Sequence, residues 1–500
     1  MLASLLSLGV VMVVFVQPIY SYLQDAKQLR RFPSPSFAGV SSLWRVWQNL
    51  RRKHYQAIHE AHQRLGTHVR IAPNHISVSD PAAMPDIYGH GANLLKDAFY
   101  DGGAGEFRNL ADSRVKSEHQ AKRRMLGHVF AQRSLTSLEP AIASCIEKLV
   151  ECVDNAANTN QPINMRRYFN YFTIDAFSNI LYGYTLNCLE RGTDMVTAET
   201  KGGKTYQAPY IKALHGSQAV TTTVSMEPGL LPITKKLFKV HPHKKDGDKY
   251  DDIIYHNTLK RMKEDRLDGD IFSRMIKNAK GEPTNLPFGE ILAECSIMMN
   301  GGTDTMASAI TYIFFLLTKN PRVFKKLREE LDAAVPADQI VPKYNTLAAL
   351  PYLRAVVEET LRVKPASTLG LPRLVPPGGR KIAGEWIDEG VTVSVPTYTL
   401  LRNPGCFEGA DEYHPERWIE SSPEQKAEMN TAHMPFSLGP RACIARNIAY
   451  FEQLLVVGGL VRAFDFEFVD GDDFEIKVME RFNSNPGEMW MKCRRRVDVE

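Results

Sequence analysis

The chain has 500 residues and a formal net charge of +4, with 44% hydrophobic and 24% charged residues. This composition is typical of a globular protein with a sizeable core, and so small a positive charge gives no argument for nucleic-acid binding. Its seven cysteines are an odd number without the paired spacing of a disulfide framework, which excludes a disulfide-stapled fold and indicates a reducing compartment. No internal repeat or low-complexity linker divides the chain after residue 40, so we expect one large domain.

The first predicted element is an apolar segment at the N-terminus. Residues 1–24 carry no charged side chain, and their first two thirds are almost continuously apolar, near the lower limit of the ~20 residues that span a bilayer. Lys27, Arg30 and Arg31 follow, so the positive-inside rule places the rest of the chain in the cytosol. We predict a transmembrane anchor over 1–24 and a basic, proline-containing hinge over 25–40. A cleaved signal peptide is the alternative, but this segment lacks a positively charged start.

Beyond residue 40 the periodicity is mostly helical, with short strands predicted at 66–79, 381–396 and 474–492. Helices therefore dominate, with small sheets at one side. The basic segment 116–133 holds few aromatic side chains that could stack on bases. It indicates contacts with anionic groups and with an acidic protein partner.

A long apolar segment, 290–319, is interrupted by Asn300-Gly-Gly-Thr-Asp-Thr305. Two glycines inside a helix cost about 1 kcal/mol each relative to alanine, so they need a physical reason. One reason is a close helix–helix crossing. The other is a local opening of the helical hydrogen-bond ladder, which would create a groove. The residues alone leave both interpretations open.

A further helix is predicted over 352–363, ending before Pro365. It carries Glu359-Thr-Leu-Arg362, a spacing that puts an acid and a base on one helix face. This pattern occurs by chance in a chain of this length, and its simplest interpretation is a solvated ion pair. The Glu359–Arg362 pattern becomes informative because it precedes the cysteine-containing segment described next, and because Arg417 lies between the two in the sequence.

The most informative segment is Phe436-Ser-Leu-Gly439-Pro-Arg441-Ala-Cys443, which is followed by an apolar helix predicted from Ile444. Gly439 and Pro440 shape a turn, Arg441 supplies a cation, and the helix N-terminus favours an anionic sulfur. These features suit a thiolate bound to a metal. The alternative is a buried structural thiol, which is what most intracellular cysteines are.

The segment Phe436-x-x-Gly-x-Arg-x-Cys443 resembles the haem-binding loop of the cytochrome P450 superfamily, and the chain looks most like fungal membrane-bound members. Gly301-Gly-Thr-Asp-Thr305 and Glu359-x-x-Arg362 follow the same family pattern, with Arg417 completing a buried Glu–Arg–Arg network. The chain departs from the family where Ala445 replaces glycine, where Met306 replaces threonine, and where His119 replaces the usual tryptophan. The resemblance implies a mainly α fold with small β-sheets, forming a single catalytic domain over 41–495.

The resemblance also assigns site residues. It makes Cys443 the axial ligand of haem iron and gives Thr305 and Asp304 a role in proton delivery. Anionic haem propionates need basic partners, and the family pattern nominates His119, Arg123, Arg373 and Arg441. Substrate contacts are expected from 89–112, 204–232, Ile297, Met298, 367–371 and 483–487.

The activity implied is that of a haem-thiolate monooxygenase, which inserts one oxygen atom of O2 into an apolar organic substrate, as in fungal secondary metabolism. Electrons would come from NADPH through NADPH–cytochrome P450 reductase, with cytochrome b5 as a further donor, at the endoplasmic reticulum membrane. Two alternatives stay open. One is a haem-thiolate isomerase or dehydratase that does not use O2, and the other is a non-enzymatic haem-binding protein.

Overall fold

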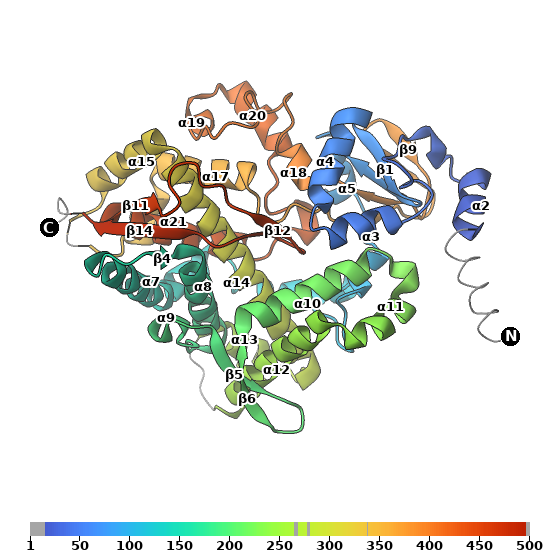
Figure 1. Ribbon diagram of the computed structural model, residues 1–500. Helices are drawn as coiled ribbons and strands as arrows, with labels where there is room; N and C mark the ends of the chain where they lie inside the picture. Colours follow the sequence, from blue (N-terminus) through green and yellow to red (C-terminus); the bar gives the residue numbers. More distant parts are fainter. Residues whose placement is uncertain (1–15, 265–268, 278–280, 338, 497–500) are drawn as a thin grey trace.

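The computed structural model describes residues 16–264, 269–277, 281–337 and 339–496. The molecule is mostly helical, with small sheets, which confirms the predicted fold class. Figure 1 shows the long helix α14 (Phe288–Lys319) passing through the middle of the molecule. The sheet that contains β1 (His68–Ala72) lies toward one end, and the sheet that contains β11 (Phe464–Phe468) lies toward the other.

The helices account for most of the described residues. They are α2 (Gln17–Gln24), α3 (Leu43–Leu50), α4 (His54–Leu65), α5 (Ala83–Tyr88), α6 (Lys116–Gly127), α7 (Leu135–Asn158), α8 (Met165–Tyr182), α9 (Cys188–Arg191), α10 (Tyr210–Ser225), α11 (Leu231–Leu237), α12 (Pro242–Lys263), α13 (Ile271–Ile276), α14, α15 (Pro321–Ala334), α16 (Tyr344–Ala348), α17 (Pro351–Val363), α18 (Thr397–Leu400), α19 (Arg417–Glu420), α20 (Pro423–Ala432) and α21 (Arg446–Ala463).

The strands form five small sheets, which include the three predicted strand regions. Besides β1 and β11 they are β2 (His75–Val78), β3 (Leu95–Lys96), β4 (Ile163–Asn164), β5 (Met195–Glu199), β6 (Thr205–Pro209), β7 (Arg373–Leu374), β8 (Arg380–Ile382), β9 (Glu385–Ile387), β10 (Thr392–Ser394), β12 (Val478–Glu480), β13 (Ser484–Pro486) and β14 (Trp490–Arg495). The largest sheet has the order β1-β2-β10-β7-β3, in which β2 and β10 are parallel. This sheet brings Lys96 and Arg373 into register as neighbours.

Helix α14 is central because it is apolar on nearly every side, and such a helix is stable only when other elements cover it. It packs against α8, α12, α17, α21 and β13. The helix is continuous through Gly301 and Gly302. A Cβ atom at Gly302 would lie 2.1 Å from the ring of Phe177 in α8, whereas a Cβ at Gly301 would meet nothing within 4 Å. Close packing therefore explains Gly302, and Gly301 has open space beside it.

The predicted anchor falls mainly on residues 1–15, which lie outside the described residues. Within the part of the chain that the structure describes, no helix has the length and apolar character needed to cross a membrane. The segment predicted as a hinge packs on the body, since Leu29 and Phe32 are buried beside the sheet. Lys27 Nζ also donates to the side chain of Asn74 at 3.1 Å.

Candidate active site

The cysteine segment forms a tight loop against α5. Gly439 has φ = +70°, and a Cβ there would lie 2.0 Å from the carbonyl oxygen of Tyr88, so only glycine fits. The Cys443 N–H donates to the Phe436 carbonyl at 2.9 Å, which closes the loop. Helix α21 begins at Arg446, confirming the helix predicted after the sulfur. The loop thus holds Cys443 at the N-terminal end of a buried helix.

Two of the departures from the family pattern, Ala445 and Met306, are accommodated by the fold. Ala445 has φ = −90°, which any L-residue adopts, so glycine is not required at this position. Met306 lies on α14 with its sulfur 3.9 Å from the amide nitrogen of Gln453 in α21. Methionine therefore fills the contact between the two helices where the family has threonine.

Cys443 faces a cavity of about 330 Å³ between α14 and α21. We call it the cysteine cavity. Its lining includes Gly301, Thr305 and Ala309 from α14, and Ile448, Ala449 and Glu452 from α21. Thr305 is exposed to this space, and its hydroxyl donates to the Gly301 carbonyl at 2.5 Å. Cys443 is exposed where it lines the cavity. Desolvation by the surrounding protein nevertheless raises the pKa of its thiol, against the opposing effects of the Ala445 N–H, Arg123 and Arg446.

The cysteine cavity is rich in cations. Lys96, Arg373 and Arg441 line it, and Arg123 Nη1 donates to the Ala442 carbonyl at 2.8 Å, beside the cysteine. Among the described residues, none of these four side chains forms an ion pair with a carboxylate. Their contacts are instead neutral: Arg441 donates to the Ser113 carbonyl at 2.7 Å, and Arg373 donates to the Tyr100 hydroxyl at 3.0 Å.

Mutual repulsion is visible in the pKa values of this cluster. Burial, and then the charges of Arg441 and Arg373, lower the pKa of Lys96 to about 6. Burial and the neighbouring Arg373 lower the pKa of Arg441 to about 10. Burial, Arg441 and Lys96 lower the pKa of His119 to about 3, so its imidazole is neutral. Basic side chains that are buried without a carboxylate partner are unfavourable on their own. An anionic group bound in the cavity would pair with them and stabilise them.

The chemistry of this donor set fits haem. The cavity offers an apolar wall, one cysteine on a loop, small residues on α14, and cations suited to two carboxylates. His119 and Arg123 do not line the cavity themselves, although Arg123 supports the cysteine loop and His119 lies close to Arg441 and Lys96. Thr305, Arg373, Arg441 and Cys443 are brought together, as the sequence predicts.

Asp304 is placed elsewhere. Its side chain is 1% exposed and does not line the cysteine cavity. Five side chains donate hydrogen bonds to it: Arg166 (3.5 Å), His215 (3.0 Å), Gln218 (3.1 Å), Asn483 (3.0 Å) and Asn485 (2.6 Å). Burial by itself raises the pKa of Asp304, but the His215 contact, the charge of Arg166 and the amide donors together hold that pKa well below its usual range. The structure therefore separates the two residues that the sequence pairs for proton delivery.

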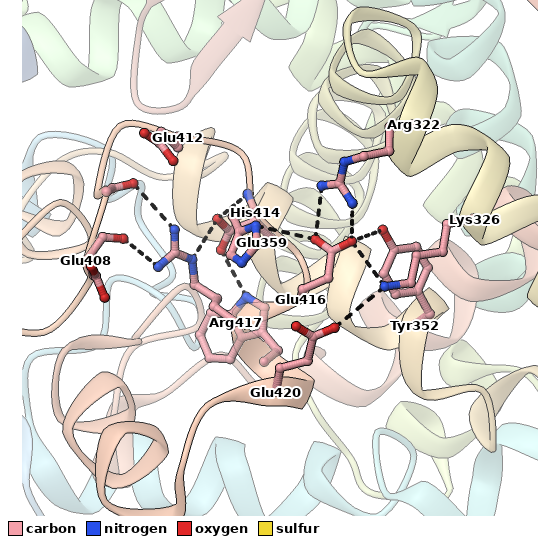
Figure 2. A network of polar contacts seen from close by, with 12 residues as sticks. Arg322, Lys326, Tyr352, Glu359, Glu408, Glu412, His414, Glu416, Arg417 and Glu420 are labelled. Carbon is pink, nitrogen blue, oxygen red and sulfur yellow. Dashed lines mark hydrogen bonds and ion pairs between the residues drawn. The ribbon is translucent and has the colours of Figure 1, made fainter.

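The predicted Glu–Arg–Arg network is present and buried. Arg362 donates to both oxygens of Glu359 at 2.8 Å, and Arg417 Nε donates to the same carboxylate at 3.0 Å. Figure 2 shows Glu359 beside Arg417 and His414, and next to it a second carboxylate, Glu416. Glu416 accepts from Arg322 at 2.6 Å and from the Tyr352 hydroxyl at 2.9 Å. Because the charges of Glu359, Arg362, Arg417 and Glu416 are all paired, the network can act as a structural clamp.

Glu452 is a site residue that the sequence analysis missed. It lines the cysteine cavity, is 1% exposed, and both its carboxyl oxygens lack a hydrogen-bond partner among the described residues. Burial alone raises its pKa to about 8, so the side chain is protonated at neutral pH. Lys96 and Tyr100 lie within the expected region 89–112, but the sequence analysis did not single out either residue. Nothing local marks these residues, because each becomes significant only through the elements packed against it.

Only part of the regions expected to contact substrate reaches the cysteine cavity. Tyr100 and Ala111 of 89–112, Ser367 and Leu371 of 367–371, and Asn483 line the cysteine cavity. Ile297, Met298 and the segment 204–232, all within the described residues, do not line it. Helix α10 from that segment instead supplies His215 and Gln218 to Asp304.

Comparison with known proteins gives a consistent result. The family model described as Cytochrome P450 matches residues 35–489. The chain is 31% identical to the benzoate 4-monooxygenase bphA of Aspergillus niger, with 99% of each chain covered. It is 30% identical to the cytochrome P450 monooxygenase efuB of Hormonema carpetanum, over 81% of this chain and 79% of that protein. It is 27% identical to the cytochrome P450 monooxygenase aba2 of Botryotinia fuckeliana, over 93% and 90%.

Proposed function

Because the chain belongs to the cytochrome P450 family and is a haem-dependent monooxygenase, we propose that Cys443 is the thiolate that binds the haem. The observation that carries this proposal is the convergence of Cys443, Thr305 and unpaired cations on one cavity. Of the seven cysteines, Cys443 is the one that lines it. The monooxygenase relatives favour this activity over an oxygen-independent isomerase and over a non-enzymatic haem-binding protein.

Haem held by a thiolate supplies the activation of dioxygen. We assign the neutralisation of its two carboxylates to Arg373 and Arg441, with Lys96 as a further basic group whose lowered pKa a neighbouring carboxylate would raise again. Arg123 fixes the cysteine loop by donating a hydrogen bond to the Ala442 carbonyl. His119 lies near Arg441 as a neutral imidazole. These assignments are supported by the absence of ion pairs on the four cations within the described part of the chain.

Thr305 is the group that we propose to pass protons into the cavity. Its hydroxyl lines the cavity and donates to the Gly301 carbonyl, so its oxygen can accept a hydrogen bond from water in the cavity. Releasing the single bond to Gly301 would free its proton for donation without unfolding the helix. Asp304 stays in the proposal as a positioning residue. Its carboxylate is occupied by five donors and fixes α10 and the β12–β13 hairpin around α14.

The substrate that fits best is a small, mainly apolar molecule, because the exposed surface of the cysteine cavity is mainly apolar and the haem itself would occupy much of the space. The relative named benzoate 4-monooxygenase makes a benzoate-like aromatic acid the first candidate to test. A place in fungal secondary metabolism is the wider proposal.

We further propose that electrons come from NADPH through NADPH–cytochrome P450 reductase, with cytochrome b5 as an additional donor. The basic segment 116–133 supports docking of an acidic partner. The uncharged segment 1–24 and the cations that follow it support anchoring in the endoplasmic reticulum membrane with the catalytic domain in the cytosol. Deletion of residues 1–31 should then shift the protein toward the soluble fraction while haem stays bound.

The ligand assignment is tested by the reduced carbon monoxide complex. Wild-type holoenzyme should show the red-shifted Soret band of thiolate ligation, and Cys443→Ser should abolish it. Cys406→Ser, a partly exposed cysteine outside the cavity, is the matched control and should keep the band. A Cys443→Ser protein that retains the band would place the ligand on another cysteine. Incorporation of one labelled oxygen atom from 18O2 into the product tests the reaction class.

A further inference from the structure

We propose that a second cavity, adjacent to the cysteine cavity, is a binding site for an organic carboxylate, recognised by Arg52. This inference goes beyond the proposed function, because it concerns a separate site and does not depend on which atom of the substrate is oxidised. If the proposal holds, the second cavity binds organic acids next to the active site.

The second cavity has a volume of about 490 Å³. It lies where the turn before α4, the segment after α17 and the β12–β13 hairpin meet, and we call it the basic cavity. Its lining includes four cationic side chains, Arg51, Arg52, Lys53 and Lys364, and no carboxylate from the part of the chain that the structure describes.

A single layer of chain separates the two cavities. Pro365 and Ser484 line the basic cavity, while their neighbours Ala366 and Asn483 line the cysteine cavity. The wall is tied together by the Ser484 N–H, which donates to the Ala366 carbonyl at 2.8 Å, and by the Ser484 hydroxyl, which donates to the Pro365 carbonyl at 2.9 Å. A ligand in the basic cavity would therefore lie directly beside the site of oxidation.

Among the described residues, none of the cations of the basic cavity is held in an ion pair, although Arg52 lies within electrostatic range of Glu480 and Lys364 within range of Glu475. Arg51, Arg52, Lys53 and Lys364 form no ion pair with any carboxylate of the described residues. The two acids closest by are already engaged. Glu480 accepts the Tyr55 N–H at 3.0 Å, and burial raises its pKa to about 7. Glu475 pairs with Lys319 at 3.2 Å. The excess positive charge would attract an anion and hold it.

Two polar atoms of the lining are left without partners. Arg52 Nη1 and Thr368 Oγ1 are both buried and form no hydrogen bond within the described part of the chain. Buried donors of this kind are costly when unpaired, and hydrogen bonds to a charged group are the strongest ones available to them. One carboxylate has two oxygens that can accept from a guanidinium and a hydroxyl together. The rings of Tyr55 and Tyr398, together with Ile476, offer an apolar surface for the body of an organic acid.

The test is equilibrium dialysis of benzoate against holoenzyme whose cysteine cavity is blocked with 4-phenylimidazole. The blocked wild type should still bind about one benzoate per chain, and Arg52→Gln should weaken this binding at least tenfold. Thr368→Val, which keeps the volume and removes the hydroxyl, should weaken it severalfold. Benzamide, a neutral molecule of the same shape, should not compete.

The matched control is Arg64→Gln, an exposed arginine of α4 that lines neither cavity and should leave benzoate binding unchanged. The proposal is wrong if the blocked wild type binds no benzoate, if Arg52→Gln and Thr368→Val bind it as well as wild type, or if benzamide binds equally. A second outcome would also overturn it: Arg52→Gln leaves benzoate binding unchanged but weakens co-sedimentation of the protein with phosphatidylserine vesicles. The anion recognised by Arg52 would then be a lipid headgroup. A failed ligand assignment for Cys443 would show in the carbon monoxide spectrum, which is independent of this binding.

Discussion

Asp304 and Thr305 are consecutive residues of α14, yet their side chains lie in different environments. Asp304 is 1% exposed and surrounded by donors from α8, α10 and the β12–β13 hairpin, whereas Thr305 opens into the cysteine cavity. Successive helical residues point about 100° apart, so neighbours in sequence need not share a face. The two residues of one motif thereby acquire separate roles.

Thr305→Val should uncouple the reaction. Valine keeps the volume but removes the only hydroxyl of α14 that lines the cavity within the described residues, so we expect haem content to stay and less product to form per NADPH consumed. The missing electrons should appear as hydrogen peroxide. Thr303→Val is the control, because Thr303 makes the same type of bond to the Met299 carbonyl but faces the core. Equal coupling in both variants would make Thr305 a packing residue.

Asp304→Asn should destabilise the protein and leave coupling intact. The change leaves the buried guanidinium of Arg166 without a counter-charge, and breaking a buried pair costs about 3–5 kcal/mol of unfolding free energy. Urea unfolding of the holoenzyme measures this loss. Asp248→Asn, on the exposed side of α12, should be nearly neutral. If Asp304→Asn instead keeps wild-type stability and loses coupling, the carboxylate carries protons after all.

Glu452→Gln should remove a pH dependence of stability. The folded-state pKa of Glu452 is about 8 and its ordinary value is 4.5, so the folded state favours the protonated form. Wild type should therefore lose stability as pH rises from 4.5 to 8, by up to about 1.4 kcal/mol per pH unit, and the glutamine variant should not. Unfolding free energies at pH 6 and pH 8 check this. The surface variant Glu428→Gln should follow wild type, and a parallel pH dependence in Glu452→Gln would refute the prediction.

Gly302→Ala and Gly301→Ala form a matched pair. The added methyl at 302 would overlap the Phe177 ring, and overpacking of this kind destabilises by about 1–3 kcal/mol. At 301 the methyl enters open space, so alanine should stabilise the helix by up to about 1 kcal/mol. It also narrows the cavity, so substrate binding should weaken. Thermal unfolding of both variants is the measurement, and equal melting temperatures would contradict the packing explanation of Gly302.

The sequence by itself determined the features that depend on short stretches of backbone. The loop before Cys443 could be read from its glycine, proline and arginine, because the conformation and polarity of such a turn are local. The Glu359–Arg362 pair and the apolar α14 were equally visible, since helical periodicity fixes which residues share a face. Their common resemblance to one family then gave the fold class and the haem site.

Only the tertiary structure decided what depends on elements distant in the chain. The separation of Asp304 from Thr305 arises because α10 and the β12–β13 hairpin fold back onto one side of α14. Glu452 becomes a protonated acid because the packing of other elements buries it without supplying a partner, and the same kind of packing leaves Arg52 Nη1 without a hydrogen bond. Desolvation and hydrogen-bond pairing are properties of the surroundings of a side chain, and no spacing along the sequence encodes them.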